Sequence, residues 1–167
     1  MRYTGAMKAV GVYYEIATKR LDDQLQSIDQ LDAKAATVYA AATAILTIFT
    51  GLLSLASLPS DALLRALVIG MLVVAILVYF LLLRALYGAY RVSDWNFRPD
   101  AATLQKNCEI YDEDMMREWV ADECTISFQE NEPMIATKTA HLHTAAVSLP
   151  VEAILLVIAG GVTLFGK

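Results

Sequence analysis

Apolar residues along this chain gather into three long blocks, and the first block has the sharpest boundaries. It starts just after Lys34, and the next charged residue is Asp61, 27 positions later. At 1.5 Å per residue, the apolar run from Ala36 to Ala56 covers about 31 Å, close to the thickness of a bilayer's hydrocarbon core. The pattern predicts a first membrane-spanning helix over residues 36–57.

The segment before this block has a different pattern. Apolar residues recur there at steps of three and four, which places one stripe along a helix: Tyr14, Ala17, Leu21, Leu25, Ile28, Leu31 and Ala35. No glycine or proline occurs between Tyr13 and Thr50. We therefore expect a cytoplasmic amphipathic helix over 1–35 that continues into the first span. Its stripe needs a partner, either the later soluble helices or another subunit.

The other two blocks predict further spans. Residues 57–65 read as a turn in which Ser60 caps the next helix, and the second span is expected over 64–88. The third block, 145–165, contains Pro150, Glu152 and two adjacent glycines. A full third span is favoured, and a kinked or partly re-entrant helix is the alternative.

The intervening segment, 91–144, is polar and predicts cytoplasmic helices. Pro99 or Asp100 can start a helix that runs through Cys108 and Tyr111, and a second helical pattern begins at Asp112. A further helix is expected after Pro133, leading into the third span. The predicted fold class is therefore an all-α membrane protein with three transmembrane helices.

Composition agrees with this architecture. Hydrophobic residues make up 57% of the chain, charged residues 19%, and the mean hydropathy is +0.47, which is high for a soluble domain. The formal net charge of −5 argues against nucleic acid or an anionic lipid surface as the main partner. The bilayer is the expected partner.

Basic residues predict the orientation, because they are enriched in cytoplasmic loops. Seven lie near span ends on one side: Lys19, Arg20, Lys34, Arg84, Arg91, Arg98 and Lys138. Arg65 and Lys167 lie on the other side. This asymmetry places the N-terminus and the 91–144 segment in the cytoplasm, and the C-terminus outside, of a cell inner membrane.

Few residues suggest chemistry. Together with Cys108 and Cys124, His141 and His143 suggest a metal site, but the two histidines point away from each other on a helix and cannot chelate one ion unless the helix is broken. A row of carboxylates lies on one helix face and is expected to be solvated rather than metal-binding: Asp114, Glu118 and Asp122. Because the sequence has no phosphate-binding glycine loop and no nucleophile motif, we expect neither enzyme activity nor a cofactor.

Glu152 is the exception inside an apolar block. An ionisable group within a span usually faces the bundle, where it meets a partner or a water-filled cavity. Arg84 and Lys34 are the candidate partners by depth, and all three residues are candidates for an intramembrane or pore site. Alternatively, the third helix starts late and Glu152 lies at the headgroups.

Small side chains mark a second candidate surface, on the first span. They recur at four-residue steps along two lines of the helix: Ala36, Ala40 and Ala44, and Thr43, Thr47 and Gly51. Small residues let helices approach closely in lipid. We expect this surface to pack against another helix, within the subunit or between subunits of a homo-oligomer.

Two short motifs carry a resemblance. Asp32 and Lys34, in the phrase Asp-Ala-Lys-Ala, directly precede the first span, and Asn131 and Lys138 precede the third. In this the chain resembles small bacterial membrane proteins of the SLATT and Pycsar transmembrane-effector type. The resemblance implies an oligomeric inner-membrane effector that perturbs or permeabilises the membrane in antiphage defence, acting with a cytoplasmic signalling protein. The alternative is a non-conducting accessory or sensor subunit that binds a cytoplasmic protein through its 91–144 helices.

Overall fold

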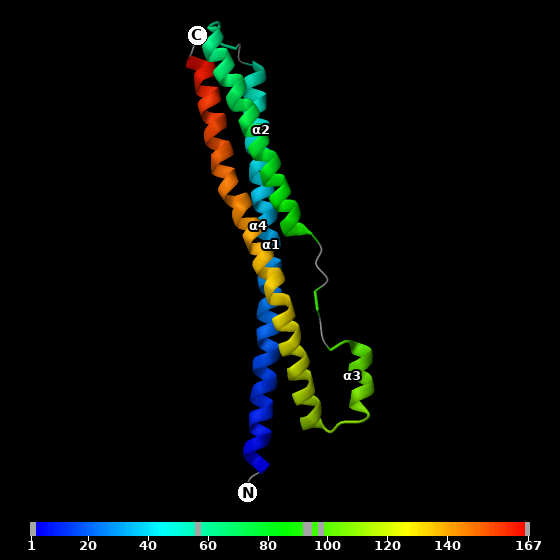
Figure 1. Cartoon of the computed structure of the whole chain (residues 1–167). Helices are drawn as coiled ribbons and strands as arrows, with labels where there is room; N and C mark the ends of the chain where they lie inside the picture. Colours follow the sequence, from blue (N-terminus) through cyan, green and yellow to red (C-terminus); the bar gives the residue numbers. More distant parts are fainter. Residues whose placement is uncertain (1–2, 56–57, 92–94, 97–98, 166–167) are drawn as a thin grey trace. The chain divides into compact units, whose positions relative to one another are not determined.

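The computed structural model describes residues 3–55, 58–91, 95–96 and 99–165 (Figure 1). Most of the described residues are helical and none of them forms a strand, so the predicted all-α class is confirmed. The helices are α1 (Tyr3–Leu55), α2 (Ala62–Tyr90), α3 (Ala101–Cys108) and α4 (Glu113–Phe165). By length and composition α1, α2 and α4 can each cross a membrane. The architecture is that of a multi-pass membrane protein.

Aspartates, rather than the predicted serine, begin the shorter helices. The Asp61 carboxylate accepts hydrogen bonds from the backbone N–H groups of Leu63 and Leu64, at 2.8 and 3.0 Å. Asp61 is therefore the N-cap of α2, and the prediction of Ser60 was wrong by one residue. Asp100 caps α3 as predicted, and its hydrogen bond from the Thr103 hydroxyl is the largest of several that lower the pKa of Asp100. This helix ends at Cys108, one turn earlier than expected.

Helix α4 is longer and more continuous than the sequence suggested. It runs without interruption from Glu113 to Phe165 and so passes through Pro133, Pro150 and the two glycines. Each proline removes one backbone donor and displaces the carbonyl four residues earlier. Both proline rings lie on the exposed face of α4, where that carbonyl can tilt outward while the buried face stays packed. The predicted break at Pro133 is therefore not found, and the third block is part of one continuous helix.

The chain divides into two compact units, which are described separately. Unit 1 comprises Met1–Gln30 and Val92–Ala136. Within it, Ala17 and Leu21 of α1 pack against Ala121 and Cys124 of α4, with Tyr14 and Val120 at the edge. The partner of the amphipathic stripe is therefore a later helix of the same chain.

Unit 2 comprises Leu31–Arg91 and Thr137–Lys167, and contains the apolar parts of three helices. In this unit α1 and α4 run parallel, and α2 runs antiparallel to both (Figure 1). The core is made of small and branched side chains: Ala35, Ala42, Leu82, Ala85, Leu86, Leu142 and Ala145. Four of these seven residues are alanines, so the helix backbones can approach closely, as is typical of packing in lipid.

Buried positions in the three long helices repeat every seven residues. On α1 they include Leu21, Ile28, Ala35 and Ala42; on α2, Val68, Ala75, Leu82 and Ala89; on α4, Cys124, Asn131, Lys138, Ala145, Glu152 and Ala159. We call these the seam positions. Seven-residue spacing is the repeat of coiled coils, in which each helix keeps one face toward its partners. In α1 and α4 the repeat passes from the charged part of the helix into the apolar part without a shift.

The seam predicts that substitution by leucine destabilises the protein at one of two nearby alanines of α1 and has no effect at the other. Ala42 is fully buried at a seam position, whereas Ala40 is exposed. Ala42→Leu should lower the free energy of unfolding of the detergent-solubilised monomer by about 1–3 kcal/mol, because the core has no room for the added atoms. Ala40→Leu should leave the monomer unchanged. Thermal melts followed by circular dichroism test this, and equal destabilisation by both variants would contradict the seam assignment.

Candidate functional site in the buried seam

Polar side chains occupy three seam positions of α4. Asn131 and Glu152 are fully buried, and Lys138 is 8% exposed. A buried polar group is costly unless a hydrogen-bond partner or a counter-charge compensates for its lost hydration. The partners of these three residues therefore indicate which of them is structural.

Asn131 is fully satisfied within unit 1. Its side-chain carbonyl accepts a hydrogen bond from the backbone N–H of Asn96 at 3.0 Å, and its amide donates to the Asn96 backbone carbonyl at 3.1 Å. The Asn96 side chain in turn donates to a carboxylate oxygen of Glu130 at 2.7 Å. Asn131 thus fixes the segment that follows α2 against α4, which is a structural role.

Lys138 forms an ion pair within unit 2. Its ammonium nitrogen lies 2.6 Å from a carboxylate oxygen of Asp32, whose side chain is 41% exposed. The Tyr90 hydroxyl of α2 donates to the backbone carbonyl of Asp32 at 3.3 Å. Asp32 of the first short motif and Lys138 of the second therefore form an ion pair. Lys34, the second charged residue of the first motif, is exposed and takes no part in the ion pair.

Glu152 is fully buried without a partner. Neither carboxylate oxygen has a hydrogen-bond partner among the described residues. Arg84 and Lys34, the partners suggested by depth, are both exposed, and neither pairs with Glu152. The predicted ion pair of Glu152 with Arg84 or Lys34 is therefore not found among the described residues.

Two polar side chains near the level of Glu152 can be located by counting along the helices. His141 of α4 lies against Gly88 of α2. Because the two helices are antiparallel, nine residues forward on α4 and nine residues back on α2 bring residue 150 and Tyr79 to the same level. The Tyr79 hydroxyl lies 3.5 Å from that of Thr43. Side chains on a helix lean toward its N-terminus, so Glu152 leans toward the level of these two hydroxyls. The contact between Tyr79 and Thr43 could not be predicted from the sequence, because the two residues belong to different helices.

The predicted helix-packing residues lie on the outside of unit 2. The small residues in question are all exposed: Ala36, Ala40, Ala44, Thr47 and Gly51. A side chain added at Gly51 would meet no atom within 4 Å. They therefore do not pack within the subunit, which instead uses Ala35 and Ala42. Packing between subunits stays a prediction.

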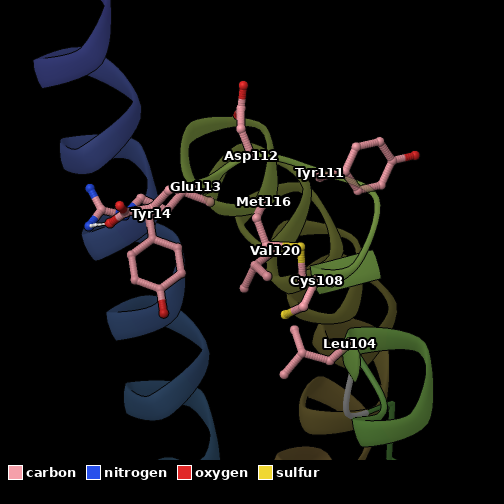
Figure 2. Close-up of a pocket in the computed structure, with 9 residues that line it drawn as sticks. Tyr14, Leu104, Cys108, Tyr111, Asp112, Glu113, Met116 and Val120 are labelled. Carbon is pink, nitrogen blue, oxygen red and sulfur yellow. Dashed lines mark hydrogen bonds and ion pairs between the residues drawn. The ribbon is translucent and has the colours of Figure 1, made fainter. Parts of the chain in front are cut away.

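Unit 1 contains an open cleft of about 530 Å³ among α1, α3 and α4 (Figure 2). Tyr14, Leu104, Cys108, Met116 and Val120 provide apolar walls. Its one cation, Arg117, is bound by the Glu113 carboxylate at 2.5 Å. Asp112 adds further negative charge at the rim, so the cleft is poorly suited to a phosphate-bearing ligand.

The other chemistry-bearing residues lie apart from one another. No group of three or more His, Cys, Asp or Glu side chains is placed to hold a metal ion in the described part of the chain. Asp122 of the acidic row accepts a hydrogen bond from the Tyr13 hydroxyl at 2.8 Å. Burial raises the pKa of the Cys124 thiol, and the carboxylates of Asp22 and Glu123 raise it further, whereas Cys108 is exposed.

The chain was also compared with known proteins. No family model, curated protein or solved structure matches it. The case for function therefore depends on the residues and contacts described above.

The ion pair between α1 and α4 should contribute measurably to stability. We expect Lys138→Met or Asp32→Asn to lower the free energy of unfolding by about 1–2 kcal/mol, less than for a fully buried pair because Asp32 is partly exposed. The double variant should cost less than the sum of the two single changes. Glu113→Gln, which breaks the exposed Arg117–Glu113 pair, is the control and should cost under about 0.5 kcal/mol. Additive effects at residues 32 and 138 would show that the two side chains do not interact.

Proposed function

We propose that this protein is an oligomeric inner-membrane effector that permeabilises the bilayer when unit 2 opens. The observation that carries the proposal is Glu152, a carboxyl group fully buried among apolar helices with no partner. An ionised carboxylate in that position would cost several kcal/mol. Burial in the closed bundle therefore favours the neutral, protonated form of Glu152.

Opening would change the environment of Glu152. If α2 moved away from α1 and α4, water would reach the buried face, and a hydrated carboxylate would favour cations over anions. The closed bundle is held at the charged end of its spans by two polar contacts of Asp32, with Lys138 and Tyr90. A signal that weakened these contacts would favour the open form.

The exposed small-residue surface supports assembly. Ala36, Ala40 and Ala44 offer a face of α1 on which a second copy can pack closely, as small residues allow in lipid. Several copies would be needed to enclose a path for ions, because each chain supplies only three spans. The resemblance to SLATT and Pycsar transmembrane effectors points to the same function, with antiphage defence as its setting.

The orientation proposed from the basic residues places unit 1 in the cytoplasm. Two of the nine residues counted for it, Arg98 and Lys167, lie outside the described residues. Of the other seven basic residues, six lie on the predicted cytoplasmic side of the spans and one lies on the opposite side. A cytoplasmic unit 1 would be available to a signalling partner.

A non-conducting accessory or sensor subunit is the second candidate function. It is favoured by apolar side chains that unit 1 leaves exposed, including Val12 at 54% and Ile16 at 49%. Such residues are typical of a surface that binds another protein.

Ion flux from liposomes separates the two candidates. The full-length Asp32→Asn variant, in which the contact with Lys138 is weakened so that the open form is favoured, is reconstituted with potassium inside and should release it. Glu152→Gln should reduce the preference for potassium over chloride several-fold, because it keeps the side chain's shape but cannot ionise. Glu132→Gln, an isosteric change at an exposed glutamate of the same helix, is the control. Absence of flux from liposomes that contain the assembled Asp32→Asn variant would support the accessory function instead.

Thiol labelling in intact cells tests the orientation. An impermeant maleimide should label Ser60→Cys from outside and should label Cys108 only after lysis. Buried Cys124, whose pKa is raised, should stay unlabelled until the protein is denatured, because the thiolate is the reactive form. Labelling of Cys108 in intact cells, without labelling at position 60, would reverse the orientation.

A further inference from the structure

Unit 2 has an apolar groove between α1 and α4 at the charged end of the spans. Its volume is about 550 Å³, and Leu31, Val38 and Leu142 form apolar parts of its lining. Lys34 and His143 also line the groove, and both side chains are exposed. The groove thus combines an apolar surface with basic groups at its edge.

The depth of the groove follows from the sequence. Lys34 is the last charged residue of α1 before an apolar run that continues to Asp61, so it lies where the span meets the headgroups. Asp32 contacts Lys138 on the parallel helix α4, so five residues farther along each helix Thr37 and His143 lie at the same level. This level is three residues beyond Lys34, or about 4.5 Å deeper in the span than Lys34. A molecule in the groove would have its polar end near Lys34 and its apolar part beside Val38 and Leu142.

The polar groups at this edge are free to donate. The acidic residue closest in sequence, Asp32, is already paired with Lys138, and Lys34 has no ion pair among the described residues. The Thr139 hydroxyl also lines the groove. His143 has at least one N–H donor in either protonation state. The edge of the groove therefore offers positive charge and several hydrogen-bond donors, with no carboxylate left to compete.

We propose that this groove binds an anionic phospholipid. The phosphate would accept hydrogen bonds from Lys34, Thr139 and His143, and one acyl chain would lie along Val38 and Leu142. Basic pockets between membrane helices at headgroup depth bind anionic lipids in this way. The proposal is independent of whether the protein conducts ions.

Native mass spectrometry of the full-length protein tests the proposal. Purified protein is incubated in a neutral detergent with equal amounts of dioleoyl phosphatidylglycerol and dioleoyl phosphatidylcholine. Phosphatidylglycerol should be retained preferentially. Lys34→Gln should weaken that retention about five-fold, since one basic residue near the membrane surface contributes about 1 kcal/mol. Ala146→Trp, which fills the groove from its exposed side, should reduce retention of both lipids.

Arg84→Gln is the matched control, because it removes one exposed positive charge from α2 without touching the groove. It should leave retention unchanged. Circular dichroism confirms that each variant keeps its helical content. Equal retention of the two lipids, or the same loss in Arg84→Gln as in Lys34→Gln, would overturn the proposal. So would a change in oligomer size in Ala146→Trp with unaltered lipid binding, since a second copy would then occupy the groove.

Discussion

The seven-residue repeat of buried positions is the constraint on which the rest of this structure depends. A helix with such a repeat keeps one face toward its neighbours over its whole length. In α1, Leu21 and Ile28 occupy this face in the charged part, and Ala35 and Ala42 occupy it in the apolar part. The reason for burial differs between the two parts. In water the apolar face avoids hydration, whereas in lipid small residues allow the close contact that holds helices together.

Polar residues at seam positions have distinct consequences. Asn131 and Lys138 meet partners that satisfy them, so they fix which segments lie together, much as a buried polar residue sets the register of a coiled coil. Glu152 occupies the same line of α4, fourteen residues beyond Lys138, and meets none. Among these three seam residues, Glu152 is therefore the position where water or an ion would be favourable. That asymmetry is the physical basis of the proposed effector function.

Much of the fold could be predicted from the sequence, and the reasons are local. Length and apolarity identified the three helices able to span a membrane, and the absence of glycine and proline between Tyr13 and Thr50 identified the long α1. The continuity of α4 through Pro133 could not be predicted, because it depends on which face of the helix the proline ring occupies. Placing Glu152 required the same information, since Arg84, which the sequence suggested as its partner by depth, is exposed. The Asp32–Lys138 pair joins residues 106 positions apart, and only the packing of α1 beside α4 brings them together.

The exposed alanines of α1 are a second case in which the sequence does not show which helices contact each other. A four-residue step of small side chains identifies a face suited to close packing, but it does not identify the helix that covers that face. In unit 2 the adjacent line, Ala35 and Ala42, contacts α2 and α4. The line through Ala40 is left for lipid or for another copy.

Disulfide trapping between α2 and α4 tests the seam most directly. The nearest ring atoms of His141 lie 3.0 Å from where a Gly88 Cβ would be, so the two Cβ atoms would lie within about 4.5 Å, as a disulfide requires. With both native cysteines replaced by serine, Gly88→Cys with His141→Cys should cross-link within one chain in native membranes. Gly88→Cys with His143→Cys should not, because His143 points away from α2. Equal cross-linking at both positions, or none at either, would contradict the seam.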